Sequence, residues 1–220
     1  MPTRGEIAAT FDAIADEFDA SRAKPWPETA TFESRLPRSA RVLDAGCGGG
    51  RNLLLLRDRG HRVVGLDASH RLLAFSAAKV GTGQLLRGDL VRVPFRRGSF
   101  DGVHCVAALH HLPTAEERLQ GTSELARVLR VGGLAMLSVW ALEQDRFAGV
   151  HDDLLRKGVA AVQDVLVPWR RADGSAVSRF YHLFRAGELE RLAQSAGLAV
   201  ERAWREGENH VVIARRPGKG

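Results

Sequence analysis

Two acidic residues and a glycine cluster are the part of this 220-residue chain best suited to chemistry. Asp44 stands just before a run that contains Gly46 and Gly48, and Asp67 follows Gly46 by 21 positions. Dinucleotide-binding α/β units carry a ribose-binding acid at about that spacing. Glycines let the backbone approach a ligand closely at the start of a helix. The pattern therefore predicts a site for a nucleoside-bearing cofactor.

Two cofactors fit this pattern. A dinucleotide needs the helix N-terminus to hold a pyrophosphate, which the carboxylate of Asp44 would repel. S-adenosylmethionine has no phosphate, and its amino group and sulfonium are cations that a nearby carboxylate attracts. Asp44 therefore favours S-adenosylmethionine, with a dinucleotide as the alternative.

The elements that must position these residues alternate between strands and helices. Buried strands are expected at 41–45, 61–66, 84–90, 100–107 and 134–140, with helices at about 50–59, 70–79 and 114–129 between them. A helix at 187–196 and strands at 198–204 and 209–215 close the chain. This order predicts an α/β fold: a doubly wound, mostly parallel, seven-stranded sheet with helices on both faces and a closing antiparallel hairpin.

Further polar residues follow the strands at the edge where open α/β sheets bind ligands. Asp89 lies just past the third strand, where an acid or its neighbouring backbone can contact an adenine. Leu109, His110 and His111 follow the fourth strand, and we expect Leu109 beside the cofactor. Adjacent histidines cannot easily point at one metal ion, so we expect no metal site. The pair is interpreted instead as a polar wall that touches cofactor or substrate.

The N-terminal region combines a packing helix with a stiff cationic segment. Residues 5–20 show helical spacing of apolar side chains, and residues 28–36 are expected to form a second short helix. Between them, prolines flank Trp26 next to Arg22 and Lys24 and prevent a continuous helix. We interpret this segment as a lid or as a surface for a base or carboxylate, with a plain linker as the alternative.

The region after the fifth strand is less regular. It contains a possible helix at about 149–158 and a strand-like stretch at 164–169. Arg179, Tyr181 and His182 then arrive together. A cation and aromatic cluster in this insertion is where a substrate-binding element would lie, although an ordinary solvated face is an equal alternative.

Length and composition indicate a single domain over residues 1–220. Within it we distinguish an N-terminal part at 1–39, a cofactor-binding core at 40–140, a substrate-side insertion at 141–185 and a closing unit at 186–220. The net charge of +6 is compatible with a polyanionic partner. Two cysteines without disulfide or metal spacing, no signal peptide and no membrane-spanning run indicate a cytoplasmic protein.

Residues 40–140 resemble the class I S-adenosylmethionine-dependent methyltransferases. The resemblance lies in the stretches VLDAGCGGG, SFDGV, HHL and LRVGGLAML, together with Asp67 and Asp89. These motifs are specific for the fold and the cofactor but not for the substrate.

Four further stretches extend the resemblance over nearly the whole chain. They are FDAIADEFDASRAKPWP, HHLPTAEER, SVWALEQ, and DVLVPW followed by RFYHLFRAGELE. They are similar to the tRNA wobble-uridine carboxymethyl methyltransferases, which include the yeast Elongator-pathway enzyme and the methyltransferase part of the AlkB-type tRNA hydroxylase. The resemblance implies methyl esterification of 5-carboxymethyluridine in tRNA and a small zinc-ribbon activator subunit.

The resemblance also implies roles for residues already singled out. Gly46, Gly48, Asp67 and Asp89 would hold S-adenosylmethionine, and Arg22, His110 or His111, and Arg179 would contact the substrate. The chain departs from the family pattern by carrying Phe11 in place of a tyrosine and Ala23 in place of an aromatic residue. A methyltransferase for a quinone, lipid or metabolite is the alternative function, and a non-catalytic RNA-binding scaffold is a third.

Overall fold

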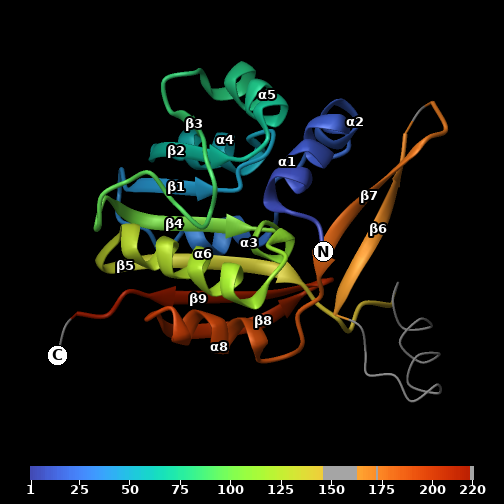
Figure 1. The fold of residues 1–220 in the computed structure, drawn as a ribbon. Coiled ribbons are helices and arrows are strands. Elements are labelled where there is room, and N and C mark those ends of the chain that lie inside the picture. The colour runs from blue at the N-terminus through green and yellow to red at the C-terminus, as the bar shows by residue number, and fades with distance from the viewer. Residues whose placement is uncertain (146–162, 172, 219–220) are drawn as a thin grey trace, which may run out of the picture.

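A seven-stranded sheet in the order β3-β2-β1-β4-β5-β9-β8 forms the centre of the molecule (Figure 1). The computed structural model describes residues 1–145, 163–171 and 173–218. The strands are β1 (Arg41–Ala45), β2 (Arg62–Asp67), β3 (Leu85–Arg87), β4 (Phe100–Val106), β5 (Leu129–Trp140), β8 (Ala199–Glu206) and β9 (Asn209–Arg215). β1 to β5 pair in parallel, whereas β9 is antiparallel to both β5 and β8. The predicted doubly wound sheet with a closing hairpin is confirmed.

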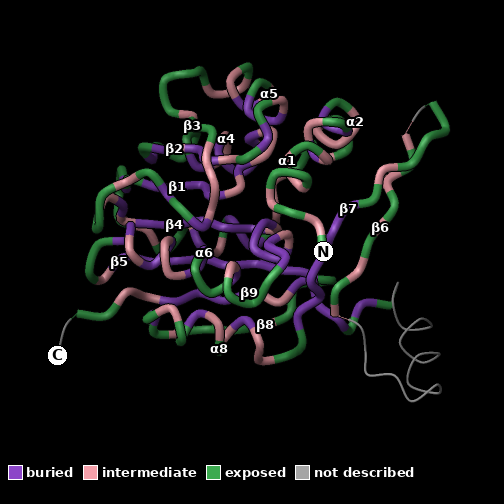
Figure 2. The backbone as a smooth tube through the Cα atoms, viewed as in Figure 1, coloured by how far each residue is buried: buried purple, intermediate pink, exposed green. Residues whose placement is uncertain are grey.

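Helices cover both faces of the sheet. On one face, α6 (Ala115–Val128) and α8 (Glu188–Ser195) bury Leu125 and Leu189 against the strands. On the other face, α3 (Glu28–Glu33) and α4 (Arg51–Asp58) contribute apolar side chains such as Phe32 and Leu53. α5 (His70–Val80) lies beside α4. The buried residues accordingly concentrate along the strands (Figure 2).

Helix boundaries follow the local capping chemistry that the sequence predicts. Ser69 Oγ accepts a hydrogen bond of 3.1 Å from the Leu72 N–H at the start of α5. Thr114 and Glu117 form a reciprocal capping box at the start of α6. Gly60 follows the end of α4 with a φ of +86°, a conformation that favours glycine.

Several predicted elements differ from the structure. The strand expected at 84–90 spans only Leu85–Arg87, and the short helix expected at 28–36 ends at Glu33. The helix expected at 5–20 is divided at Ile14 (φ −111°, ψ 8°) into α1 (Arg4–Ala13) and α2 (Ala15–Ala20). The strand expected from residue 134 begins at Leu129, because Leu129 already pairs with Phe100 of β4. The helix expected at about 149–158 lies outside the described residues.

A second, two-stranded sheet stands beside α1 and α2 at the carboxyl ends of the parallel strands (Figure 1). β6 (Asp164–Arg170) and β7 (Ala176–His182) pair antiparallel from Asp164–His182 to Arg170–Ala176. The sequence predicted strand character in β6 but did not predict β7. The sheet is tied to the N-terminal helices because Trp169 Nε1 donates a 3.0 Å hydrogen bond to Glu17 Oε2.

Candidate active site

The glycine turn after β1 forms the floor of the site. Gly46 has a φ of +79°, and a Cβ there would lie 2.4 Å from the Cβ of Ala108, so only glycine fits. Gly48 has a φ of +52° and open space where a side chain would begin. The turn is held from behind, since Ser76 Oγ donates a 2.7 Å hydrogen bond to the Gly48 carbonyl oxygen.

Asp67 at the end of β2 faces this turn. Its two carboxylate oxygens accept hydrogen bonds from the Gly48 and Ser69 N–H groups, both at 2.8 Å. Burial raises the pKa of Asp67 to about 6 despite these two hydrogen bonds, and the negative charges of Asp44 and Asp12 add to the rise. A buried carboxylate of this kind can accept further hydrogen bonds from ligand hydroxyl groups.

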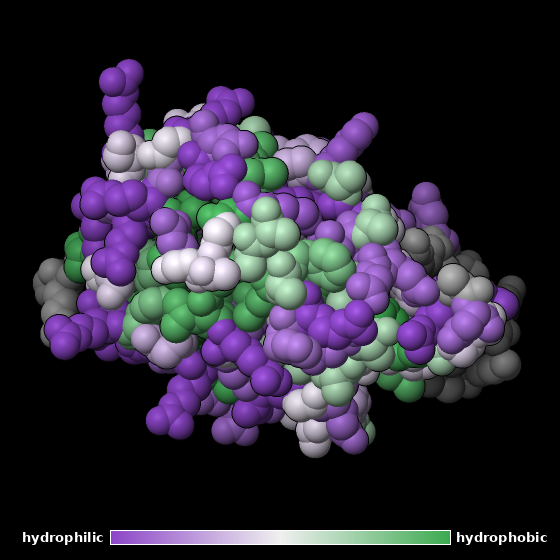
Figure 3. All heavy atoms as spheres, turned by 90° about the horizontal axis from the view of Figure 1, so that it is seen from above, coloured by the Kyte–Doolittle hydropathy of each residue, from purple (hydrophilic) through white to green (hydrophobic). Residues whose placement is uncertain are grey.

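A cavity of about 500 Å³ opens in front of the glycine turn and Asp67. Its walls come from the turn, the end of β2, the loop after β3, the segment after β4 and the helices α1 and α2. Its volume lies within the range of cofactor and small-molecule sites. Seen from above, hydrophobic residues gather in the middle of the molecular surface and hydrophilic side chains surround them (Figure 3).

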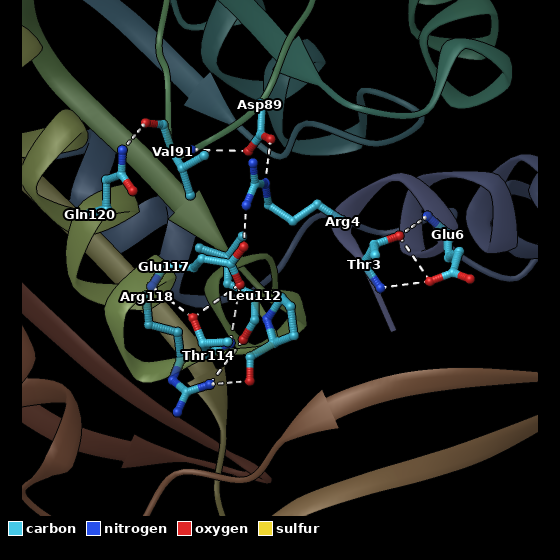
Figure 4. Close-up of polar contacts among 11 residues, drawn as sticks. Thr3, Arg4, Glu6, Asp89, Val91, Leu112, Thr114, Glu117, Arg118 and Gln120 are labelled. Carbon is cyan, nitrogen blue, oxygen red and sulfur yellow. Dashed lines mark hydrogen bonds and ion pairs between the residues drawn. The ribbon is translucent and has the colours of Figure 1, made fainter. Parts of the chain in front are cut away.

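An ion-pair network holds α1 over one end of this cavity (Figure 4). Arg4 Nε donates a 2.6 Å hydrogen bond to Asp89 Oδ2, and Arg4 Nη1 donates to Glu117 in the first turn of α6. The other oxygen of Asp89 accepts a 3.0 Å hydrogen bond from the Val91 N–H. Asp89 is therefore fixed at the cavity wall, and α1 is tied to the loop after β3 and to the first turn of α6.

His110 and His111 are neutral, and their hydrogen bonds fix the tautomer of each ring. The Trp140 N–H lies 3.0 Å from His110 Nδ1, which must therefore accept. His111 Nδ1 lies 2.8 Å from the Phe180 carbonyl oxygen, so it must donate, which leaves Nε2 as an acceptor. Burial lowers the pKa of His111 to about 4 and that of His110 well below its usual range. Of the two, only His111 lines the cavity.

An aromatic and cationic cluster lies behind His111. The Tyr181 ring stacks on Trp140 with centroids 4.1 Å apart, and its centroid is 4.5 Å from that of His111. Arg179 Nη1 donates a 2.7 Å hydrogen bond to Tyr181 Oη, and its guanidinium lies 4.8 Å from the Trp169 ring centre. Arg179 and Tyr181 are both buried. Because Tyr181 contacts His111, which lines the cavity, β7 brings a cation close to the cavity wall.

His182 also lies in β7 and was predicted to bind substrate, but its side chain lies away from the cavity. Its ring lies between two carboxylates, with Nδ1 2.7 Å from Asp164 Oδ1 and Nε2 2.8 Å from Glu188 Oε1. Burial opposes ionisation of Glu188, but hydrogen bonds from His182 and the Arg185 N–H outweigh it and lower the pKa of Glu188 to about 2. His182 thus joins β6, β7 and α8 and does not line the cavity.

The cationic segment before α3 packs against the start of α4, directly after the glycine turn. The Arg22 guanidinium is 5.1 Å from the Phe18 ring centre. Arg51 lies 4.8 Å from the Trp26 ring centre, and its Nη1 donates a 2.9 Å hydrogen bond to the Lys24 carbonyl oxygen. Burial, with the positive charge of Arg22 nearby, lowers the pKa of Arg51 to about 10. Trp26 is half-buried and the Lys24 side chain is exposed.

The structure thus separates the predicted site residues into groups. The predicted site residues that line the cavity are Gly46, Gly48, Asp67, Asp89 and His111. Asp44, Leu109 and His110 are almost completely buried and do not line it. Arg22 packs on Phe18 and Arg179 packs on Trp169, and these two rings contact each other with centroids 5.8 Å apart. Lys24, Trp26 and Tyr181 do not line the cavity either.

Sequence analysis missed several residues of the site. It treated residues 5–20 as packing residues, yet Phe11 and Phe18 line the cavity. Arg4, just before that stretch, was not singled out and lines the cavity too. Arg51 was not singled out, although it joins Trp26 to the start of α4. Only the departure at Phe11 from the family pattern pointed in this direction, because a tyrosine there would face the cofactor.

Two further findings concern the described part of the chain. Within residues 1–145, 163–171 and 173–218, no cluster of three histidine, cysteine or acidic side chains could hold a metal ion. Over the same residues, no helix is long and apolar enough to cross a membrane.

Comparison with known proteins agrees with the geometry. Residues 43–137 match the family described as a methyltransferase domain. In the solved complex of the Haloferax volcanii Trm112 methyltransferase activator with a methyltransferase, the matched chain is 20% identical, with a TM-score of 0.70 over 97% of this chain and 99% of that one. A Methanosarcina mazei S-adenosylmethionine-dependent methyltransferase gives a TM-score of 0.71 at 20% identity, over 89% of this chain and all of that one.

The fold and the matched domain define a class I S-adenosylmethionine-dependent methyltransferase. The tRNA (carboxymethyluridine(34)-5-O)-methyltransferase of Schizosaccharomyces pombe is 31% identical, over 96% of each chain. The Xenopus tropicalis protein of that name, alkbh8, is 30% identical over 98% of this chain, which spans 43% of its length. The chain belongs to the family of tRNA (carboxymethyluridine(34)-5-O)-methyltransferases.

Proposed function

We propose that this protein methylates the carboxylate of 5-carboxymethyluridine at the wobble position of tRNA. A carboxylate oxygen attacks the methyl carbon of S-adenosylmethionine, and the carbon–sulfur bond breaks. The bonding electron pair stays on sulfur. The products are a methyl ester and S-adenosylhomocysteine, and no proton moves.

The tautomer and the low pKa of His111 are the main support for this proposal. Its Nδ1 donates to the Phe180 carbonyl oxygen, and its pKa of about 4 makes Nε2 a poor base near neutral pH. Phenol and amine acceptors lose a proton on methylation and benefit from a base. A carboxylate is already ionised and needs only alignment with the methyl group and exclusion of water. The site is therefore better suited to a carboxylate acceptor.

We assign cofactor binding to the cavity. Asp67 would accept hydrogen bonds from the ribose hydroxyls, and Asp89 would lie at the adenine. The turn at Gly46 and Gly48 would take the methionyl part, close to the carboxylate of Asp44. Open space at Gly48 and the buried acceptors of Asp67 support this orientation.

We assign substrate binding to the residues that flank the cavity. Arg22 and Arg179 would grip phosphate or carboxylate oxygens, for which a planar guanidinium is well suited. Lys24 and Trp26 would support the nucleotide, and Tyr181 would support His111, whose ring centroid lies 4.5 Å away. The cation must leave the attacking oxygen free, because pairing lowers its nucleophilicity.

We also propose that a small zinc-ribbon protein of the Trm112 type activates this chain. The support is the similarity to a methyltransferase chain solved together with that activator. Co-expression with such a protein should give a complex that co-elutes on size exclusion and methylates tRNA faster than the chain alone.

The testing experiment uses radiolabelled S-adenosylmethionine and total tRNA from a strain that lacks this gene. The protein is assayed alone and with the zinc-ribbon partner. Label in tRNA that mild alkali releases as methanol supports the methyl ester. Alkali-stable label would move the reaction to a base or ribose. No label with either preparation, while the cofactor still binds, would replace tRNA by a small-molecule substrate.

A further inference from the structure

A chain of buried polar side chains runs from the cofactor side of the sheet to the segment that contains Trp26. His104 Nδ1 lies 2.8 Å from Asp44 Oδ1, and His104 Nε2 lies 3.1 Å from Thr29 Oγ1. Thr29 Oγ1 lies 3.3 Å from Asn52 Oδ1, which accepts a 3.0 Å hydrogen bond from the Trp26 N–H. We call these five residues the relay.

The relay is enclosed by the fold. Asp44, His104, Thr29 and Asn52 are at most 6% exposed and come from β1, β4, α3 and α4. Polar side chains are costly to bury unless they are hydrogen-bonded, and removal of one partner leaves the next group unsatisfied. The position of each member therefore depends on its neighbours.

The two ends of the relay lie near different parts of the proposed site, although Asp44 itself does not line the cavity. At one end, Asp44 Oδ2 is buried and has no hydrogen-bond partner among the described residues. Asp44 lies two positions before Gly46, which lines the cofactor cavity. At the other end is the backbone of Trp26, between Pro25 and Pro27. Because Asp44 Oδ2 is shielded from the cavity, a cation bound at the glycine turn would attract this carboxylate electrostatically and would not contact it directly.

We propose that His104 and Thr29 are positioning residues that couple cofactor binding to the placement of Trp26. With the cationic amino group of the cofactor at the glycine turn, the Asp44 carboxylate would shift toward that charge and would carry the hydrogen-bonded His104 ring with it. His104 in turn holds the Thr29 hydroxyl, and Asn52 holds the Trp26 backbone. The link to substrate binding rests on the proposed function, because it takes Trp26 to be part of the tRNA-binding surface.

The sequence supplies a direct reporter of the relay. Pro25 and Pro27 have no N–H group, so the Trp26 amide is isolated between them, and its hydrogen bond goes to Asn52. With ¹⁵N-tryptophan labelling, amide hydrogen exchange can be followed at the four tryptophans. Saturating S-adenosylhomocysteine, which keeps the cationic amino group, should slow exchange at Trp26 by about two- to tenfold, the effect of strengthening one hydrogen bond.

Two matched variants at Thr29 distinguish the effect of its hydroxyl group in the relay from the effect of its packing. Thr29→Val keeps the shape but removes the hydroxyl, whereas Thr29→Ser keeps the hydroxyl and removes a methyl group. Thr29→Val should bind S-adenosylhomocysteine within about twofold of the wild type yet lose the slowing of exchange at Trp26. Thr29→Ser should retain it. In methylation assays, Thr29→Val should raise KM for tRNA more than it lowers kcat.

The outcomes distinguish the relay from the proposed function. The coupling is overturned if saturating S-adenosylhomocysteine leaves the exchange rate of the Trp26 amide unchanged in the wild type. It is also overturned if S-adenosylhomocysteine slows this exchange as much in Thr29→Val as in the wild type. If Thr29→Val does not fold, His104→Gln takes its place with the same expectations. A wild type that shows the exchange response but labels no tRNA, either alone or with the zinc-ribbon partner, supports the coupling and refutes the tRNA substrate.

Discussion

Cofactor binding should weaken about tenfold between pH 7 and pH 5 because Asp67 becomes protonated. With its pKa at about 6, the ionised fraction of Asp67 falls from about nine tenths at pH 7 to about one tenth at pH 5. Only the ionised carboxylate can accept hydrogen bonds from the backbone and from the ribose with both oxygens. Affinity should therefore be flat above about pH 7 and fall as pH drops through 6.

The direction of the stability change helps to separate loss of binding from unfolding. The pKa of Asp67 is raised above its ordinary value, so the folded protein takes up this proton more readily than the unfolded chain does. This group alone therefore makes the ligand-free protein more stable, relative to neutral pH, as pH falls through about 6. His111, with a pKa of about 4, stays largely neutral over this range.

Isothermal titration calorimetry with S-adenosylhomocysteine from pH 5 to pH 8 measures the effect. Asp67→Asn is the matched control: it should bind weakly at every pH and show little pH dependence between 5 and 7. A wild-type Kd that is constant across the range would refute the argument. So would an Asp67→Asn variant that keeps the wild-type slope.

Three substitutions test other parts of the site. Arg4→Ala should raise the Kd for S-adenosylhomocysteine about two- to fivefold, as expected for a partly exposed ion pair; Arg35→Ala, which breaks the ion pair to Glu201, should not change it. Gly46→Ala should lower stability by about 1–3 kcal/mol in urea unfolding, because its Cβ would meet Ala108; unchanged stability would contradict the strain. Arg179→Ala should cut methylation of tRNA while cofactor affinity changes less than about twofold, and loss of cofactor binding would contradict its assignment to substrate.

Local patterns predicted the sheet and its helices well, and predicted the surroundings of the site poorly. The strand at 41–45 and the caps at Ser69 and Thr114 depend on near neighbours in the chain, so the sequence contains the relevant information. β7 was missed because its partner is β6, and a two-stranded sheet forms through pairing that no single segment reveals.

The sequence by itself determined the order of the elements, the glycine turn and the acid after β2. These follow from residue type and short spacing, because a left-handed φ needs glycine and a buried strand needs apolar residues. They were sufficient to predict a nucleoside-bearing cofactor. The motifs of the whole chain then identified the family.

Only the tertiary structure decided which polar groups meet. Arg4 and Asp89 are 85 positions apart, and Asp44 and His104 are 60 apart. Burial lowers the pKa of His111, and the Phe180 carbonyl oxygen fixes its tautomer. Burial and hydrogen-bond partners set these properties, and both arise when distant segments pack together.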